Sequence, residues 1–248
     1  MQKTKKKVAI VTGAARNIGR ATCLELAKLN FNILVHANTD QVGAKETASL
    51  VKTMGVETKI FMGDLTNIKV VEKLFQNSSE LGDLSVLVNN ASQRNFLKFE
   101  EMTYEDWKKI LSINIDSIFL TCKSAIPLMR IKSWGRIINL GGLSAHIGAI
   151  GRAHVVTSKM AVIGLTRALA TEYAGTGITV NCVVPGLIDT IRGKSSGAGL
   201  VHPTHSDPPL GRKGKPIEVA KMIKNLCENN SDFLNGQTIH VNGGSYYS

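Results

Sequence analysis

The feature that most constrains the fold is an alternation of two residue patterns along the whole chain. Short runs rich in apolar and β-branched residues predict seven strands, at Val8–Val11, Ile33–Val35, Thr58–Phe61, Val86–Val88, Arg136–Leu140, Thr179–Val184 and Thr238–Val241. Segments with helical spacing lie between them, at Ile18–Leu29, Lys69–Leu81, Tyr104–Met129, Val156–Tyr173 and Pro216–Cys227. Such alternation is typical of right-handed βαβ crossovers. The sequence therefore predicts one α/β domain over residues 1–248, with a doubly wound, seven-stranded parallel sheet between helices.

Charge and composition narrow the class of partner. Lys and Arg outnumber Asp and Glu by 30 to 19, which gives a net charge of +11. The basic residues are scattered, and no stripe of aromatic residues accompanies them, as stacking on a single nucleic acid strand would need. We therefore expect no nucleic-acid partner. We expect instead a small-molecule substrate, and the positive field would favour an anionic one.

The cysteines and the apolar runs indicate a compartment. Cys23, Cys122, Cys182 and Cys227 stand singly, without metal-ligand or CxxC spacing, so buried reduced thiols and no metal site are expected. Only Val8–Val11 follows the basic start, which is too short for the apolar part of a signal peptide. No apolar run approaches the roughly 18 residues of a membrane span. The prediction is a cytoplasmic protein without a membrane partner.

One segment breaks the rhythm of strands and helices. Residues 193–215 are rich in Gly, Ser and Pro and follow the predicted strand that ends at Val184. In open α/β sheets ligands bind beyond the carboxyl ends of the strands, and long loops in compact domains are usually functional. We predict that this segment is a substrate loop, which would line the pocket together with Gln93–Phe99.

A strand, a tight turn and a helix start are predicted where Val8–Val11 meets Thr12–Gly19. Gly13 permits the sharp turn, and Gly19 lets the helix pack closely on the sheet. Backbone N–H groups at the helix N-terminus would then face a pyrophosphate. Asn17 stands where the middle glycine of such turns is usual. With a strand before it and a helix after it, the turn predicts a dinucleotide site.

Further motifs, in order along the chain, resemble those of the short-chain dehydrogenase/reductase family, whose members have a Rossmann-type fold and use nicotinamide cofactors. Thr12–Gly19 resembles the family's TGxxxGxG turn, and Asn89–Ser92 is similar to its NNAG segment. Asp64-Leu65 resembles the pair that contacts adenine, Lys159 the lysine that binds the ribose, and Pro185–Thr190 the segment that fixes the carboxamide and pyrophosphate. The predicted cofactor-binding residues are Gly13, Arg16, Asn17, Ile18, Gly19, Asn38, Thr39, Asp64, Leu65, Asn90, Ala91, Ser92, Lys159, Pro185, Gly186, Ile188 and Thr190.

The end of the second predicted strand decides between the two nicotinamide cofactors. An NAD enzyme places an acid there for the ribose 2′-hydroxyl, but this chain has Ala37. The main obstacle to a 2′-phosphate is thus absent. Arg16 can reach that region with a positive charge, while Asn38 and Thr39 add neutral donors. NADP(H) is favoured over NAD(H), with a merely solvated Arg16 as the alternative.

The family's acid–base pair is not found at its expected positions. The resemblance puts a tyrosine four residues before Lys159 and a serine thirteen residues before that tyrosine. This sequence has Val155 and Gly142 there, and neither side chain can transfer a proton. Asn114 fits the family's helix asparagine, which holds a water that relays protons from the lysine. Its alternative role is a hydrogen bond at a helix kink.

Four nearby residues could take over the chemistry. Arg152, two helical turns before Lys159, could bind a carboxylate or an oxyanion. His154 has a suitable ordinary pKa but lies about 140° around a regular helix from Lys159, so it serves only if the chain is still a loop there. Ser144 could bring its hydroxyl to the vacant serine position, and His146 follows in the same loop. Ser144 and His154 are the preferred pair.

Three functions remain open from the sequence. The first is an NADP(H)-dependent oxidoreductase with a non-standard acid–base group, in which Lys159 and Asn114 support the proton path. The second is a redox-silent relative that binds the dinucleotide as a sensor or structural subunit. The third is a lyase or decarboxylase in which Arg152 holds a carboxylate. Tyr104–Met129 and Val156–Tyr173 resemble the helices through which the family packs its subunits, so a homotetramer or homodimer is expected.

Overall fold

The computed structural model describes residues 6–191 and 208–247, and they form a seven-stranded sheet in the order β3-β2-β1-β4-β5-β6-β7. Every neighbouring pair of strands is parallel. This confirms the predicted fold class. The strands are β1 (Lys7–Val11), β2 (Asn32–Ala37), β3 (Thr58–Met62), β4 (Asp83–Asn89), β5 (Gly135–Leu140), β6 (Ile178–Pro185) and β7 (Thr238–Val241).

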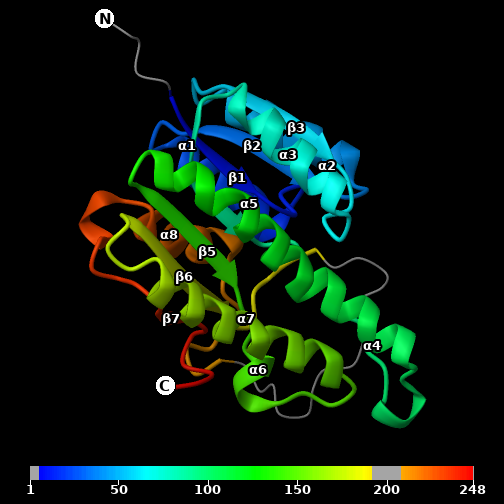
Figure 1. Ribbon diagram of the computed structural model, residues 1–248. Helices are drawn as coiled ribbons and strands as arrows, with labels where there is room; N and C mark the ends of the chain where they lie inside the picture. Colours follow the sequence, from blue (N-terminus) through cyan, green and yellow to red (C-terminus); the bar gives the residue numbers. More distant parts are fainter. Residues whose placement is uncertain (1–5, 192–207, 248) are drawn as a thin grey trace, which may run out of the picture.

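Helices cover both faces of the sheet (Figure 1). On one face lie α1 (Asn17–Ala27), α2 (Gln41–Lys52) and α8 (Pro216–Leu226), and on the other α3 (Ile68–Ser79), α5 (Ser117–Ile131) and α7 (Ala153–Glu172). Two further helices, α4 (Tyr104–Leu111) and the short α6 (Ser144–Ile147), lie at the lower end of the view in Figure 1, beyond the carboxyl end of β5.

Strand β1 shows why these runs form a buried sheet. Its side chains alternate between two hydrophobic cores, with Ala9 and Val11 in the core beneath α1 and α8 and Val8 and Ile10 in the core beneath α3 and α5. All four are fully buried. A strand that is buried on both faces needs apolar residues at every position rather than at alternate ones, and that is the pattern from which the strand was predicted.

The order of the strands places the ligand-binding edge. β1 pairs with β2 on one side and with β4 on the other, so the connections that leave β1 and β4 diverge to opposite faces at the carboxyl ends. In open α/β sheets ligands bind at such a switch point. The turn after β1 and the segment after β4 both lie at this edge.

Helices α2 and α6 were not predicted, and α7 begins earlier than expected. The α2 stretch is polar, with a glycine at position 43, which hides its helical spacing; Asp40 caps it by accepting a hydrogen bond from the Gly43 N–H at 2.9 Å. The α6 helix has only four residues. Helix α7 begins at Ala153 rather than at Val156, a shift that affects a predicted site residue.

The predicted helix Tyr104–Met129 is continuous to Ile131, but it contains a π-helical turn, η2 (Ser112–Asp116), between α4 and α5. By length and composition alone this helix is apolar enough to span a membrane, which the sequence analysis did not expect. In the fold 44% of its most apolar 18-residue window is buried, and α5 packs on β4 and α3. Part of its apolar surface therefore covers the sheet, and part, including Phe119 and Leu128, is exposed.

The remaining predictions on organisation have mixed outcomes. All four cysteines are buried and free, as expected. Of the predicted substrate loop, residues 193–207 lie outside the described residues. Its last part is described, and Gly214 there pairs in parallel with Ile188.

Candidate active site

The turn after β1 has the close packing that its glycines predicted. Gly13 adopts φ +61°, a left-handed conformation that favours glycine. A Cβ on Gly19 would lie 2.4 Å from the Gly13 carbonyl oxygen and 2.8 Å from the Cα of Ala14. Only glycine at position 19 lets α1 approach the turn this closely.

The start of α1 can bind an anion. Its N-cap residue, Arg16, makes no side-chain capping hydrogen bond, and the first helical turn carries no acidic residue. The first backbone N–H groups of a helix lack partners within the helix, and the helix dipole makes this end positive. Uncapped in this way, the α1 terminus is suited to a phosphate group. Ile18 lies in this first turn and is half-buried.

Residues that follow β4 hold the turn after β1 in place through hydrogen bonds. The Asn90 side-chain amide donates to the carbonyl oxygens of Thr12 and Gly13, both at 2.9 Å. The Thr12 hydroxyl accepts from the backbone N–H groups of Asn90 and Ala91 at 2.9 and 3.0 Å. Asn90 and Ala91 thus hold the predicted phosphate turn in place, whereas Ser92 is exposed beside it.

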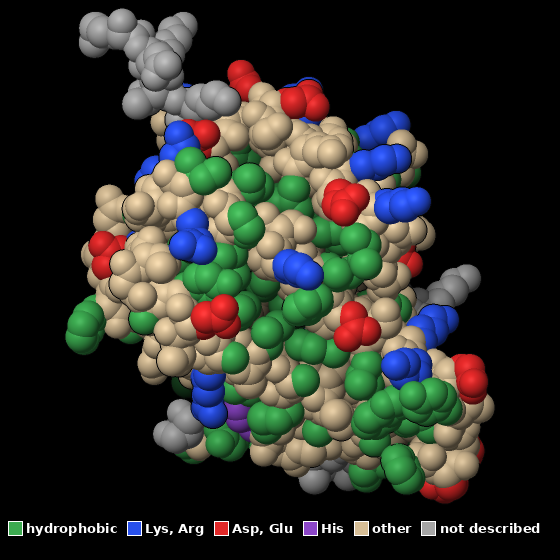
Figure 2. Space-filling model, viewed as in Figure 1, with side chains coloured by type: hydrophobic (Ala, Val, Ile, Leu, Met, Phe, Trp, Pro, Cys, Tyr) green, Lys and Arg blue, Asp and Glu red, His purple; other side chains and the backbone are tan. Residues whose placement is uncertain are grey.

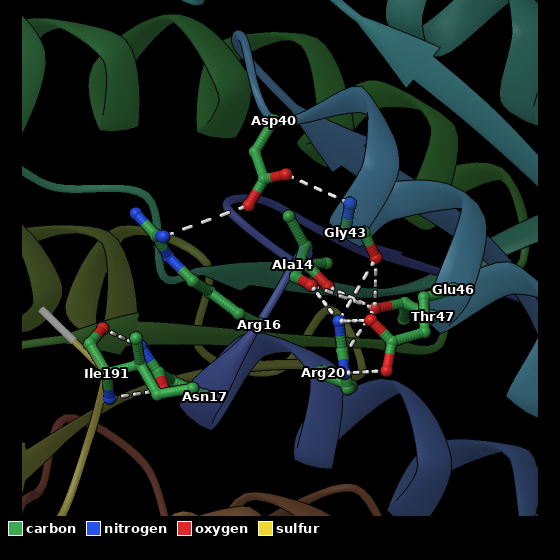
Figure 3. Close-up of polar contacts among 10 residues, drawn as sticks. Ala14, Arg16, Asn17, Arg20, Asp40, Gly43, Glu46, Thr47 and Ile191 are labelled. Carbon is green, nitrogen blue, oxygen red and sulfur yellow. Dashed lines mark hydrogen bonds and ion pairs between the residues drawn. The ribbon is translucent and has the colours of Figure 1, made fainter. Parts of the chain in front are cut away.

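Asn17 does more than replace the usual glycine. It adopts φ +53°, a conformation that asparagine tolerates better than most residues. Its side-chain amide donates to the Ile191 carbonyl at 2.9 Å and its oxygen accepts from the Ile191 N–H at 3.0 Å (Figure 3). This pair of hydrogen bonds joins the start of α1 to the segment that follows β6, a contact that the sequence did not reveal.

Arg16 lies where the cofactor prediction needed it, but an acid lies beside it. Its side chain is 48% exposed, and its Nη1 is 3.9 Å from the carboxylate of Asp40 (Figure 3). Asn38 and Thr39 are exposed in the same connection, and Ala37 is buried. Near the end of β2 a ligand would thus meet the Arg16 cation, the Asp40 carboxylate and the neutral side chains of Asn38 and Thr39. Asp40 was not among the predicted site residues, because the helix that it caps, α2, was not predicted.

Arg20 is a second residue that sequence reasoning missed. Its guanidinium forms a two-point ion pair with Glu46 at 2.7 and 2.8 Å, and it donates to Thr47 Oγ1 at 3.0 Å and to the Ala15 carbonyl at 2.7 Å. Figure 3 shows these contacts between α1 and α2. Arg20 therefore ties the phosphate turn to α2.

The two residues predicted to contact adenine, Asp64 and Leu65, differ in their exposure to solvent. Asp64 is exposed, and its carboxylate accepts from the N–H and the hydroxyl of Thr66, both at 2.9 Å. Leu65 is 5% exposed and packs in the core beneath α3. Asp64 is thus available to a ligand at the surface, while the Leu65 side chain points into the protein.

The segment after β6 returns to the same edge. Pro185 ends β6, and Gly186 lies so close to Asn242 that a Cβ on it would be 2.6 Å from the Asn242 Cα. Ile188 is 8% exposed, and the Thr190 hydroxyl lies 3.5 Å from its carbonyl oxygen. An open groove of about 540 Å³ is lined by this segment, by α1 and by the start of α8. Its lining residues include Asn17, Arg20, Thr190, Ile191, Pro216 and Ile217.

Lys159 is a buried amine at the carboxyl end of β5. It is 3% exposed, and its Nζ donates to the Leu140 carbonyl at 2.7 Å. Burial, with a further contribution from the positive charge of Arg94, lowers the pKa of Lys159 to about 8. An amine with such a pKa can donate or accept a proton near neutral pH.

Lys159 and Ser144 both lie next to Gly142. A Cβ on Gly142 would lie 3.5 Å from the Cγ of Lys159 and 3.9 Å from the Oγ of Ser144. The Ser144 hydroxyl is thus close to the place that a serine at position 142 would occupy. The structure brings together these two of the predicted catalytic residues. Val155 is 1% exposed in the first turns of α7.

Asn114 lies in the π-helical turn η2 and is fully buried. Its oxygen accepts from the Gln93 N–H at 2.8 Å, and its amide donates to the Gln93 carbonyl at 2.9 Å and to Ser158 Oγ at 3.0 Å. The side chain therefore anchors the predicted lining segment Gln93–Phe99 against α7. Farther along, the Leu97 N–H donates to the Gly151 carbonyl at 2.8 Å.

The expectation for His154 is wrong. It required a loop, but His154 is the second residue of α7 and is 1% exposed, so the regular helix turns it away from Lys159. The pKa of His154 is lowered by burial, and the charge of Asp106 on α4 partly opposes this. Arg152 is the N-cap residue of α7. It follows Gly151, whose carbonyl accepts the hydrogen bond from the Leu97 N–H.

His146 packs against the C-terminal part of the chain. Its ring packs against His240 of β7, with ring centroids 4.5 Å apart, and against Tyr246 at 5.0 Å. Burial lowers the pKa of His146. The ring thus joins α6 to the C-terminal segment, and its sequence position next to Ser144 gave no sign of this.

The chain matches the family described as "Enoyl-(Acyl carrier protein) reductase" over residues 13–246. It is 34% identical over 248 residues to a 3-oxoacyl-(acyl-carrier-protein) reductase of Buchnera aphidicola, covering 98% of this chain and 99% of the relative. Identity to the Vibrio cholerae reductase of the same name is 35% over 240 residues, 97% of each chain. Among solved structures, acetoin dehydrogenase of Salmonella typhimurium superposes with a TM-score of 0.87 at 31% identity, covering 97% of each chain.

Asn17 generates a stability prediction. Asn17→Ala removes both hydrogen bonds to Ile191 and places alanine at positive φ, so we expect a loss of about 2–3 kcal/mol in the free energy of unfolding. Asn17→Gly removes only the bonds and should cost about 1 kcal/mol. Urea denaturation measures both. Asn77→Ala, which removes an amide bonded only within α3, is the control; equal losses for Asn17→Ala and Asn77→Ala would contradict the assignment.

Proposed function

The chain belongs to the short-chain dehydrogenase/reductase family, and we propose that it is an NADP(H)-dependent member that interconverts a carbonyl compound and an alcohol with a non-standard acid–base group. The observation that carries the proposal is that the Lys159 side chain and the Ser144 hydroxyl both lie within 4 Å of the position that a Cβ on Gly142 would occupy. Both lie at the same edge of the sheet as the phosphate turn. The dinucleotide and the proton-transferring groups would then meet there.

The residues of the turn fit a dinucleotide. The uncapped start of α1 suits a pyrophosphate, and by resemblance to the family Lys159 would hold the nicotinamide ribose and Asp64 the adenine. Bound nicotinamide supplies or accepts the hydride. Arg16 supports NADP(H), because its exposed guanidinium offsets Asp40 and leaves donors for a 2′-phosphate.

The cofactor choice is tested at Arg16. Arg16→Ala should weaken NADPH binding by about 10–100-fold, the range for one charge-assisted hydrogen bond, and should leave the Kd for NADH within about threefold. Fluorescence titration with both cofactors measures the two constants. Lys52→Ala, at the far end of α2, is the control for a lost surface charge. An unchanged ratio of the two Kd values in Arg16→Ala would contradict the choice of NADP(H).

We assign the proton transfer to Lys159 and Ser144. In the direction of reduction, the hydride adds to the carbonyl carbon and the electron pair of the C=O double bond moves to oxygen. Ser144 would donate a hydrogen bond to that oxygen, and the Lys159 ammonium would deliver the proton that completes the alcohol. The neutral amine would be reprotonated from solvent. Asn114 would act as a positioning residue that holds the pocket segment in place through Gln93.

The substrate we propose carries a negative charge. Arg94 acts electrostatically on Lys159, and Arg152 occupies the N-cap position of α7, three residues before the buried Val155. A guanidinium binds carboxylate and phosphate groups well. The net charge of +11 would favour the approach of such a substrate.

The acid–base assignment is tested by NADPH consumption with oxo acids and their neutral methyl esters. We expect turnover of the acids. Because the protonated amine of Lys159 is required, kcat should be flat below about pH 8 and should fall tenfold per pH unit above it. Ser144→Ala should lower kcat by about 10²-fold. Ser79→Ala, whose hydroxyl bonds within α3, should leave kcat unchanged.

The other outcomes of this assay point to the alternatives. Tight NADPH binding without oxidation of NADPH by any carbonyl compound would favour the redox-silent protein. A product formed without a change in nicotinamide absorbance would favour the lyase or decarboxylase.

The double variant Gly142→Ser, Val155→Tyr tests whether the pocket can still support reduction when the family's serine and tyrosine are restored. The added Cβ at position 142 meets only ordinary contacts, and gained reductase activity would show that the pocket still accepts substrate.

We also propose that the chain forms a homodimer or, preferentially, a homotetramer in the cytoplasm. Figure 2 shows hydrophobic side chains gathered over the face on which α5 lies. On α5 and α7 they include Phe119, 49% exposed, Leu128, 37%, and Met160, 47%. Helices α5 and α7 were predicted from the family resemblance to pack against those of another subunit.

Light scattering after gel filtration tests the assembly. The wild-type protein should elute with two or four times the mass of the chain, and Phe119→Lys should shift it toward the monomer because a charge would be buried in the interface. Val42→Ser changes an 80% exposed residue on α2 and should leave the mass unchanged. A monomeric wild-type protein at micromolar concentration would refute the proposal.

A further inference from the structure

His36 is a buried histidine that bonds at both ring nitrogens. It is the penultimate residue of β2 and is 1% exposed. Its Nδ1 accepts a hydrogen bond from the Gly13 N–H at 3.3 Å, and its Nε2 lies 2.9 Å from the Gly63 carbonyl oxygen. A carbonyl oxygen can only accept, so Nε2 carries the proton and Nδ1 is the acceptor. The two contacts together require a neutral ring.

The two partners of His36 belong to different parts of the dinucleotide site. Gly13 forms the phosphate turn, and Gly63 immediately precedes Asp64, the exposed carboxylate at the predicted adenine end. Backbone bonds meet at the same point: the Ala14 N–H donates to the His36 carbonyl at 2.7 Å, and the Gly63 N–H donates to the Ala37 carbonyl at 3.1 Å. The ring therefore connects two segments about fifty positions apart in the sequence.

We propose that His36 is a positioning residue for the adenine half of the dinucleotide, because its neutral ring holds the phosphate turn and the loop before Asp64 in fixed relation. The inference rests on the proposed function, since it presumes that a dinucleotide occupies this edge. His36 does not itself touch the cofactor in this assignment. It acts through the two glycines that it bonds.

The chemistry of the ring sets the expected effect of each substitution. Leucine would leave the Gly13 N–H and the Gly63 carbonyl without their partners, and unpaired buried polar groups are costly. Asparagine can retain an acceptor near Nδ1, and glutamine can retain a donor near Nε2. Each polar variant should therefore keep one of the two connections, which a general packing role would not predict.

The ring also predicts a pH dependence. Protonation of Nδ1 would place two donors, the ring N–H and the Gly13 N–H, face to face. Burial lowers the pKa of His36, and the hydrogen bond to the Gly63 carbonyl and the charge of Asp64 partly oppose this. The turn after β1 presents backbone groups to the ring, and β3 presents the Phe61 ring. With the folded-state pKa below the ordinary value of about 6.5, the ordered site is fully present above that pH. It is lost as the pH falls through the lowered folded-state pKa.

Binding of NADPH and of adenosine 2′,5′-bisphosphate between pH 5.5 and 8 tests the proposal. We expect His36→Leu to bind both ligands at least about tenfold more weakly at pH 7.5, with His36→Asn and His36→Gln between it and the wild type. Protonation of the ligand's 2′-phosphate, whose second pKa is about 6, weakens binding to both proteins in acid, and the wild type should lose more affinity than His36→Gln as the pH falls below about 6.5. His240→Gln, at a partly buried histidine of lowered pKa on β7, should keep the wild-type profile.

Two results would overturn the inference: affinities of His36→Leu within twofold of the wild type, or the same acidic loss in His36→Gln as in the wild type. If circular dichroism shows that His36→Leu does not fold, the Asn and Gln variants decide, and wild-type affinity in both would overturn it. A wild-type protein that binds neither NADPH nor NADH would refute the proposed function as well. Wild-type binding with unaffected variants would refute the role of His36 alone.

Discussion

The site depends on the hydrogen bonds by which the end of β4 holds the turn after β1. Asn90 and Thr12 satisfy four backbone groups between them, and this fixes the left-handed Gly13 against the strand that borders the switch point. Because α1 can approach only through Gly19, the direction of α1 follows from the same turn. The same edge of the sheet holds Lys159, Ser144 and the segment after β6, and their proposed roles depend on this shared position with the turn.

Much of the fold could be predicted from the sequence because the sheet is buried on both faces. Residues such as Val8 and Ala9 belong to opposite cores and must both be apolar, so the strands stand out as continuous runs. Helix α2 lacks such a signal: it is held by Asp40 at its cap and by Arg20 through Glu46 and Thr47. The Asp40 cap is local, whereas the Arg20 contacts join α1 to α2 and no local pattern shows them.

The candidate site was predictable only in part. The glycines and Lys159 follow from motif spacing, but the role of a side chain depends on where a helix begins. A start at Ala153 turns His154 away from the site, and a single turn of helix places the Ser144 hydroxyl beside Gly142. Asp40, Arg20 and the Asn17–Ile191 contact lie between segments distant in sequence, so only the folded chain shows them.

The π-helical turn η2 has a consequence for how this sequence can change. One extra residue in a helix rotates everything after it by about 100° relative to everything before it. With η2 in place, Ile110 before it and Ile118 after it are both buried, and Asn114 between them faces the site. Loss of one residue there would turn the apolar side of α5 off the sheet. We infer that this stretch accepts substitutions far more readily than insertions or deletions.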